Sequence, residues 1–362
     1  MMKNKITCIA FFSVVFVFSL LCTLLPKDDF SESERRVLKD FPEMSTESIL
    51  SGDFASGFEE YATDTFPFRD AFRSIKAYLS SLVFNKTDNN GLFSQDGHLS
   101  KVEYPLNMPM LDHASERFWF IYENYLKDVN TNVYLSIVPD KNYFLDTLKI
   151  DYDGLTSYMQ SKMPYAQYID IFPTLAINDY YTTDSHWRQE YIGDTAKAIA
   201  GAMHSKISFN NYTENVLNVP FYGVYVGQSA MKVSPDMIKY FTNEIIEGCI
   251  VTSYDTGRPK PAAMYNMDKA NGRDPYEMFL SGNCSLLTIE NPKAEKRREL
   301  VVFRDSFAGA LVPFLCEGYS KITLVDIRYI HPNTLENYIE FSNQDVLFIY
   351  STSVLNNSET IK

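Results

Sequence analysis

Two short motifs, far apart in this sequence, contain the residue types of a nucleophilic triad. Asp184 and His186 lie two positions apart in one motif, and Ser306 lies in the other. A serine hydroxyl becomes a nucleophile when an imidazole takes its proton, and a carboxylate on the second ring nitrogen orients that imidazole. If the fold brings these side chains together, they predict acyl transfer through a covalent intermediate on the serine.

Ser306 is expected between a strand and a helix. Apolar residues 300–303 precede it, and a helical pattern covers 308–317. In a parallel sheet this position is the carboxyl end of a strand, where open α/β folds bind ligands. Free N–H groups at the start of the helix would hold an oxyanion. The alternative is an ordinary helix cap, since Ser and Asp are preferred there, and for Ser306 alone the cap is the better interpretation.

Asp184 and His186 are expected in an extended loop that directs both side chains into one site. Asp184 would then accept from one ring nitrogen of His186 while the other nitrogen faces a hydroxyl. Asp184 could instead cap a helix that begins near Arg188, with His186 at the surface. Each motif alone favours the simpler structural role, whereas the two together favour a triad.

The segments around these motifs predict an α/β fold with a parallel sheet covered by helices. Short β-branched runs alternate with helical patterns from residue 112 onward, which is typical of such a sheet. Strands are expected at 133–138, 168–171, 286–289, 300–303, 322–325 and 346–349, and helices around 118–125 and at 153–163, 189–204, 308–317 and 334–341. Residues 210–284 carry Gly, Pro, Asn and Asp breakers and predict an irregular β-rich insertion.

The N-terminus predicts a transmembrane anchor. Residues 6–25 carry no charge and are long enough to cross a bilayer. Lys3 and Lys5 precede this run, so residues 1–5 are expected in the cytoplasm and the rest of the chain outside the membrane. A cleaved signal peptide is the competing interpretation, although no small-x-small cleavage site follows the apolar run.

The remaining chain divides into three parts by pattern. Residues 26–45 predict a polar linker, and 46–110 predict an N-terminal helical segment, interrupted by Pro67, followed by a hairpin. Residues 111–362 are expected to form the α/β domain that carries both motifs.

Composition excludes some functions and leaves others open. The net charge of −13 argues against nucleic acid as a partner, because a phosphate binder needs a basic surface. The chain has five His and five Cys without a metal-ligand spacing, so no metal site is expected. Outside the cytoplasm Cys249 and Cys284 could pair, but nothing in their spacing requires a disulfide.

The motifs together resemble a known bacterial family. The chain is similar to the DHHW proteins, which belong with the alginate O-acetyltransferase-like branch of the SGNH hydrolases. The resemblance runs through most of the chain after the anchor. It is carried by residues 64–69 (DTFPFR), 138–141 (VPDK), 183–187 (TDSHW), 276–283, 304–307 (RDSF) and 325–329 (VDIRY). It implies an SGNH-hydrolase-like three-layer fold.

The resemblance also implies roles for individual residues. Ser306 would be the nucleophile, His186 the base and Asp184 its orienting carboxylate. Two positions depart from the family pattern: Ser185 replaces the first His of the family's name, and Arg304 stands where a Gly-Asp-Ser motif has glycine.

An oxyanion hole and a substrate cleft are expected near the triad. Gly282 and Asn283 are the candidates for the oxyanion hole, although a plain turn explains them equally well. Lys141, Arg328 and Tyr329 are the candidates for lining the cleft. For each of these three alone, salt bridging or edge packing is the simpler role.

The function expected from these features is extracytoplasmic and serine-dependent. The chain would be an O-acyl, most simply O-acetyl, transferase or esterase acting on a cell-surface polysaccharide of the cell envelope. No cofactor is implied, and the resemblance suggests a membrane-bound O-acyltransferase as partner. A non-catalytic glycan-binding or assembly protein is the alternative, since the chain has 25 Tyr and 26 Phe and exposed rings stack on sugars.

Overall fold

The computed structural model divides the chain into two compact units, each described here by itself. One unit comprises residues 1–90 and 224–233, and the other comprises residues 91–223 and 234–362. The structure describes residues 2–31, 33–34, 36–82, 88–89, 91–231, 233–294 and 297–362.

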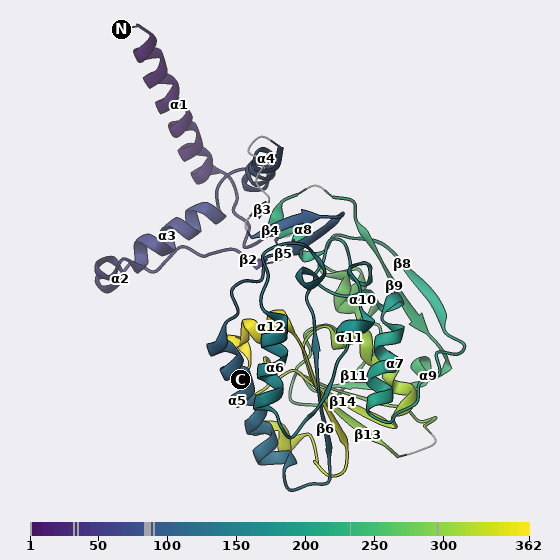
Figure 1. Cartoon of the computed structure of the whole chain (residues 1–362). Helices are drawn as coiled ribbons and strands as arrows, with labels where there is room; N and C mark the ends of the chain where they lie inside the picture. Colours follow the sequence, from purple (N-terminus) through teal and green to yellow (C-terminus); the bar gives the residue numbers. More distant parts are fainter. Residues whose placement is uncertain are drawn as a thin grey trace. The chain divides into compact units, whose positions relative to one another are not determined.

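The second unit is built on an eight-stranded sheet (Figure 1). The strand order is β11-β10-β12-β14-β13-β15-β6-β7, and the five strands from β14 to β7 are parallel. Their bounds are β14 Lys321–Val325, β13 Glu299–Arg304, β15 Asp345–Ser351, β6 Asn132–Val138 and β7 Gln167–Ile169. Five of the six expected strands are therefore confirmed as parallel, with small shifts at their ends. The sixth, expected at 286–289, is a strand but pairs antiparallel with β14.

Helices cover both faces of this sheet, which makes three layers. On β13, Val301 and Phe303 face a core shared with α5 (Met108–Ile121), α6 (Tyr152–Lys162) and α12 (Thr352–Asn356). The alternate residues Leu300 and Val302 face a second core, shared with α7 (Gly193–Ala202) and α11 (Ala308–Leu315). Figure 1 shows these two sets of helices on opposite sides of the sheet. The period-two alternation of apolar side chains is what gives a buried strand two apolar faces.

Much of the expected insertion joins the main sheet. β10 (Ile250–Ser253) and β11 (Lys260–Ala262) extend it antiparallel, next to β12 (Leu286–Glu290). Only β8 (Thr213–Phe221) and β9 (Asp236–Thr242) form a separate hairpin. The Gly, Pro, Asn and Asp breakers in this region mark turns between strands. Sequence pattern locates such turns but does not show which strands pair.

Two helices differ from expectation. Residues 189–204 form a short 3-10 turn, Gln189–Tyr191, before α7 begins at Gly193. Residues 334–341 form no α-helix; a 3-10 turn, Pro332–Asn337, lies there instead, and the His331 side chain caps it. This unit also contains the hairpin of β4 (Leu92–Gln95) and β5 (His98–Lys101), a π-helical turn Tyr122–Leu126, and the short helices α9 (Glu244–Gly248) and α10 (Met267–Ala270). Further 3-10 turns are Lys141–Phe144, Phe172–Thr174, Ile177–Asp179, Pro275–Met278, Cys316–Gly318 and Ser358–Thr360.

The cysteines are free thiols. Cys284 contacts Ser253 Oγ at 3.3 Å and the Leu286 carbonyl at 3.4 Å, so it does not pair with Cys249. Cys249 instead hydrogen-bonds the thiol of Cys316.

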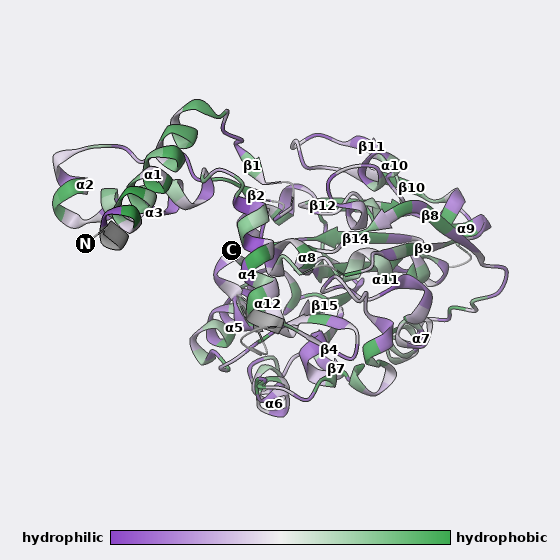
Figure 2. Ribbon diagram, turned by 90° about the horizontal axis from the view of Figure 1, so that it is seen from above, coloured by the Kyte–Doolittle hydropathy of each residue, from purple (hydrophilic) through white to green (hydrophobic). Residues whose placement is uncertain are grey.

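The first unit is mainly helical. Its helices are α1 (Met2–Leu24), α2 (Thr46–Ser51), α3 (Asp53–Asp64), α4 (Arg69–Leu82) and α8 (Val224–Ser229), with the two-residue strands β1 (Phe30–Ser31), β2 (Arg36–Val37) and β3 (Asp88–Asn89). Within α1, Lys5–Leu24 is long and apolar enough to cross a membrane, and none of it is buried inside the chain. Figure 2 shows α1 as an almost continuously hydrophobic helix.

Candidate active site

Ser306 lies at the carboxyl edge of the parallel strands, directly after β13. The neighbouring Asp305 is fully buried and fixes this corner, because its carboxylate accepts from the backbone N–H groups of Phe307 (3.0 Å) and Ser351 (2.7 Å). The residue before α11 is Phe307, and no side chain caps this helix. The Ser306 hydroxyl is therefore not a helix cap and is available for another partner.

That partner is His186. Ser306 Oγ lies 2.7 Å from His186 Nε2, and Asp184 Oδ1 lies 2.6 Å from His186 Nδ1. Asp184 is buried and also accepts from the His186 backbone N–H at 3.1 Å. The arrangement fixes Nδ1 as a donor to the carboxylate and leaves Nε2 to accept the serine proton. The structure brings together the three side chains that the two motifs singled out.

Aromatic rings enclose the imidazole. The ring of Tyr276 stacks on His186 with centroids 4.0 Å apart and an interplanar angle of 17°, and Phe307 lies 5.0 Å away on a tilted plane. Burial, reinforced by the charge of Asp184, raises the pKa of Tyr276 well above its ordinary value. Tyr276 is thus a neutral aromatic ring stacked on the imidazole of His186. The sequence motif at 276–283 gave no indication of this contact.

The loop from Tyr180 to Trp187 is anchored to the helix that follows the serine. The Trp187 indole N–H donates to the Phe307 carbonyl at 2.9 Å, and the Gln189 amide donates to the Ala310 carbonyl at 2.8 Å. Tyr180 and Trp187 also form a β-bridge with each other. These contacts tie the loop that carries His186 to the segment after Ser306 through the backbone as well as through the contact between the two side chains.

Asp236 supports the same loop from beneath, and sequence reasoning missed it. Its carboxylate accepts from the backbone N–H and the hydroxyl of both Thr182 and Thr183, at 2.6–3.0 Å. Gly223 packs against the loop so closely that a Cβ there would lie 2.4 Å from Asp184 Cβ and 2.4 Å from the Thr183 carbonyl oxygen. Only a glycine fits at that position without moving the loop.

Lys141 also supports this loop. Its side chain is 1% exposed, and Nζ donates to the carbonyls of Leu99, Tyr181 (2.8 Å), Thr182 (3.1 Å) and Asp184 (3.1 Å). Burial lowers the pKa of Lys141 to about 7, opposed by the charges of Asp184 and Asp236. The sequence suggested that Lys141 lines a cleft. In the structure its ammonium is instead buried and donates to backbone carbonyls inside the protein.

Arg304 holds the segment with the two expected oxyanion residues. Its buried guanidinium donates to the carbonyls of Gly282 (3.0 Å) and Cys284 (3.1 Å), on either side of the exposed Asn283. Gly282 has φ +70°, where a side chain would be strained, and a Cβ would lie 2.7 Å from Glu277 Cγ. The arginine in place of the expected glycine thus positions the Gly282–Asn283 turn.

The last two candidates lie after β14, at the same edge of the sheet. Arg328 forms a bidentate ion pair with Asp326 (2.9 and 2.7 Å). Burial would lower the pKa of Arg328, but this pair raises it above its ordinary value. Tyr329 is 47% exposed and lies beneath the Arg328 guanidinium, 5.5 Å from ring centroid to cation. Tyr329 is therefore free to meet a ligand, whereas Arg328 is committed to Asp326.

Within the part of the chain that the structure describes, no group of three or more His, Cys, Asp or Glu side chains is placed to hold a metal ion.

Known structures share this fold. No family profile and no characterised protein matches the sequence itself. A crystal structure of a DHHW family protein from Eubacterium siraeum superimposes with a TM-score of 0.62 at 20% identity, covering 76% of this chain and 95% of that one. PatB1 of Bacillus cereus superimposes with a TM-score of 0.58 at 18% identity, covering 75% of this chain and 98% of PatB1. The fold implied by the resemblance to DHHW proteins is thereby confirmed.

A second PatB1 structure carries a sulfonyl adduct. It superimposes with a TM-score of 0.55 at 20% identity, covering 75% of this chain and 96% of PatB1.

Proposed function

We propose that this protein is a serine-dependent O-acyltransferase or acylesterase that acts on a cell-surface polysaccharide. The observation that carries the proposal is the continuous chain from Asp184 Oδ1 through His186 to Ser306 Oγ, with both contacts at 2.6–2.7 Å. In this chain the imidazole takes the serine proton as Oγ attacks an acyl carbonyl. The Asp184 carboxylate stabilises the imidazolium that forms.

The tetrahedral intermediate needs donors for its oxyanion. The backbone N–H groups of Ser306 and Ala308 are the first proposed source, since those of Phe307 and Gly309 already donate to Asp305 and Ser306. The turn at Gly282–Asn283 is the second proposed source. Collapse of the intermediate expels the donor's leaving group, which takes the proton from His186 and leaves an acyl group on Ser306. A sugar hydroxyl then accepts the acyl group in a transferase, or water accepts it in an esterase.

The substrate class comes from the resemblance to the alginate O-acetyltransferase-like branch. An acetyl group is the simplest acyl group for this chemistry, and a membrane-bound O-acyltransferase would supply it from the cytoplasm. The α1 helix is proposed as an uncleaved anchor, because Lys5–Leu24 has the length and composition of a membrane span. With Lys3 and Lys5 inside, the triad would lie outside the membrane.

The decisive test is covalent labelling of Ser306. Wild type, Ser306→Ala and the control Ser94→Ala, which changes an exposed hairpin serine, are each treated with a sulfonyl fluoride and with 4-nitrophenyl acetate. Wild type and the control should gain one sulfonyl group on Ser306 and turn over the ester, and Ser306→Ala should do neither. Equal turnover by wild type and Ser306→Ala would refute the triad.

The non-catalytic alternative predicts a different outcome of the same experiment. A glycan-binding or assembly protein would retain saturable polysaccharide binding in Ser306→Ala and would show no ester turnover in any variant. Mass spectrometry of cell-wall polysaccharide from a Ser306→Ala strain then separates transfer, which would lower acetylation, from hydrolysis, which would raise it.

A further inference from the structure

The last turns of helix α1 contact aromatic residues of their own unit. Phe18 stacks on Phe66 with ring centroids 5.3 Å apart and planes at 12°, and contacts Phe72 at 5.9 Å. Phe18, Leu21 and Cys22 are half-buried, whereas most of α1 is exposed. Residues at this spacing share one side of a helix, so the turn after α3 and the start of α4 pack beside the last turns of α1.

The position of Phe18 along α1 sets a depth. Phe18 lies six residues before Leu24, where α1 ends, which is about 9 Å at the rise of an α-helix. If α1 spans the bilayer, Phe66 and Phe72 therefore lie about 9 Å below the outer end of the span. Interfacial apolar side chains reach about 5–10 Å into the boundary between headgroups and acyl chains.

Tyr61 marks the level of the headgroups. It lies on α3, and its ring lies 4.5 Å beneath the ammonium of Lys27, just beyond the end of the apolar run. Tyrosine and lysine are both common at the membrane–water boundary. The chain thus descends from Tyr61 at this boundary to Phe66 beside Phe18.

The turn between α3 and α4 suits an apolar environment. Phe68 is 63% exposed and Phe66 is 39% exposed. Backbone hydrogen bonds continue through the turn: Thr65 N–H donates to Tyr61 O, Arg69 N–H to Phe66 O and Phe72 N–H to Phe68 O, at 2.9–3.1 Å. These bonds satisfy part of the turn's backbone, which lowers the cost of bringing it near lipid.

Helix α4 continues the same surface. Its apolar residues fall on one face and remain uncovered, with Phe72, Ile75 and Leu79 at 44%, 53% and 40% exposure. An exposed contiguous apolar face of this kind marks an interaction site. A hollow of about 840 Å³ beside it is lined by Phe58, Ala62, Phe66 and Phe72 together with the polar residues Glu59, Thr63, Arg69, Arg73 and Lys76.

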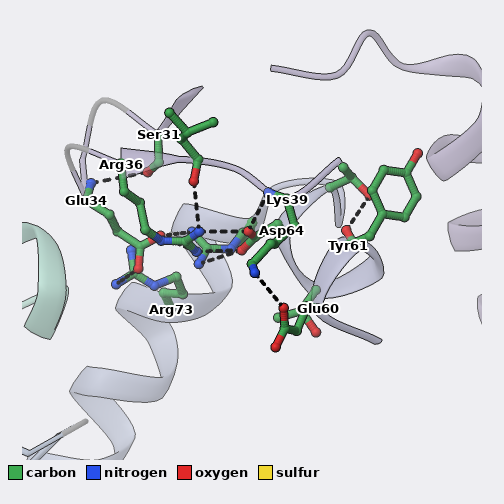
Figure 3. A network of polar contacts seen from close by, with 12 residues as sticks. Ser31, Glu34, Arg36, Lys39, Glu60, Tyr61, Asp64 and Arg73 are labelled. Atoms are coloured by element: carbon green, nitrogen blue, oxygen red, sulfur yellow. Dashed lines mark hydrogen bonds and ion pairs between the residues drawn. The ribbon is translucent and has the colours of Figure 1, made fainter. Parts of the chain in front are cut away.

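The charges close to the turn are neutralised in pairs. Arg36 forms a bidentate pair with Asp64 (2.7 and 2.5 Å), and Glu34 accepts from Arg69 (2.6 Å) and Arg73 (3.1 Å). Figure 3 shows Arg36, Asp64, Glu34 and Arg73 gathered in this network. The hydrogen bond from Arg36 lowers the pKa of Asp64, so the pair stays ionised. Pairing reduces the cost of bringing these groups near lipid.

We propose that the α3–α4 turn inserts into the outer leaflet of the membrane beside α1, with lipid acyl chains against Phe66, Phe68 and the apolar face of α4. The protein would then hold the bilayer by two elements, a span and an adjacent wedge. The inference rests on α1 being an uncleaved span, as proposed above, and is independent of the triad chemistry.

The test places a tryptophan at three depths of the full-length chain. Phe68→Trp reports the turn, Phe12→Trp reports the middle of α1, and Val216→Trp reports an exposed strand of the catalytic unit. Each variant is reconstituted in vesicles of phosphatidylcholine and phosphatidylglycerol, with or without bromine on the acyl chains. The emission of the parent protein is subtracted from that of each variant, because Trp119 and Trp187 are present in all of them. Turnover of 4-nitrophenyl acetate is measured in parallel.

Insertion predicts that bromine quenches most of the added emission of Phe68→Trp and Phe12→Trp and none of that of Val216→Trp. Quenching of Phe12→Trp alone would overturn the inference. In that case a blue-shifted Phe68→Trp would assign the surface to a second copy or another membrane protein. Absence of quenching in both Phe68→Trp and Phe12→Trp would show that α1 does not span the membrane, which would overturn the inference. Ester turnover would then remain, so the proposed triad would stand. Equal quenching of all three would show unspecific adsorption and also refute the inference.

Discussion

The loop from Tyr180 to Trp187 carries the proposed base, His186, and is called the base loop. The segment from Tyr276 to Cys284 faces it and is called the facing loop. The two are held in place by different means. The loop from Tyr180 to Trp187 is fixed by buried polar groups on several sides: Lys141 on its carbonyls, Asp236 on its N–H groups and hydroxyls, and the Trp187 indole on the helix after Ser306. The segment from Tyr276 to Cys284 depends on Arg304, with further hydrogen bonds from Asn266 and within its own turns.

The two loops also differ in backbone strain. Leu280, Ser281 and Gly282 adopt φ of 52°, 62° and 70° in succession, and such positions cost of order 1–3 kcal/mol for residues other than glycine. The base loop has no residue of this kind between Tyr180 and Trp187, all of which the structure describes. We infer that the base loop fixes the position of His186, while the backbone strain lies in the segment whose Tyr276 ring stacks on His186.

The largest effect should come from Gly223→Ala. The added methyl group would overlap Asp184 Cβ and the Thr183 carbonyl, so the base loop must move, and a displacement of about 1 Å at a catalytic group costs roughly 100-fold in rate. Ester turnover should therefore fall by at least about 100-fold. Gly201→Ala is the matched control, because a methyl group there meets nothing within 4 Å and the position is in α7. Equal activity of the two variants would show that the loop tolerates displacement.

Lys141→Met should have the next largest effect. Methionine fills a similar space but leaves four carbonyls without their donor, including that of Asp184. We expect kcat for ester turnover to fall roughly 10- to 100-fold with little change in KM, because the orientation of His186 is disturbed rather than substrate binding. Lys197→Met, at an exposed lysine, is the control. A change in KM alone would return Lys141 to the role of a substrate contact.

Arg304→Lys tests the facing loop. A lysine ammonium lacks the planar fork that reaches the carbonyls on both sides of Asn283. Sulfonylation and ester turnover should slow by about 10-fold, less than for Lys141→Met, because the base stays in place. The pH at which turnover is half-maximal should not move, since the triad is untouched. A shifted pH profile would mean that Arg304 acts on His186 and not on the Gly282–Asn283 turn.

The buried Asp140 precedes Lys141, which supports the base loop, and it should make the free energy of unfolding depend on pH. Burial raises the pKa of Asp140 to about 6, although Thr352, Tyr152 and the Asn142 N–H donate to its carboxylate. The folded state therefore binds a proton more tightly than the unfolded state, and stability should decrease as the pH rises from about 4 to about 6, by at most about 3 kcal/mol. Asp140→Asn should remove this slope in urea titrations of the full chain in detergent. An unchanged slope would assign it to another group.

The smallest effect is expected for Ser185→His, which restores the first His of the DHHW pattern. Ser185 is half-buried, and its hydroxyl lies 3.5 Å from Asp184 Oδ1, at the limit of a hydrogen bond. Turnover should remain within about threefold of wild type, as for most substitutions outside a packed core. A larger loss would mean that the hydroxyl helps to orient Asp184.

Local pattern predicted the parallel strands and the two motifs, because strand periodicity and residue type are written into short stretches of sequence. The contact between Ser306 and His186 also followed, since parallel strands place their carboxyl ends at one edge. The supports did not follow. Lys141 was a candidate for lining the cleft, and Asp236 resembled an ordinary charged residue in sequence. Only the fold shows that both are buried against the base loop. The pairing of β10 and β11 with the main sheet was hidden for the same reason, because it depends on contacts between distant segments.

The division of the chain into units has a practical consequence for engineering. Gly223 and Asp236, which both support the base loop, flank residues 224–233, and these residues belong to the N-terminal unit. There Arg73 donates to the carbonyls of Gly227 (2.7 Å) and Gln228 (3.2 Å). A soluble fragment that starts at Gly91 therefore keeps α8 but discards the arginine that holds it. A secreted version should therefore keep residues 26–90 and replace only the apolar helix.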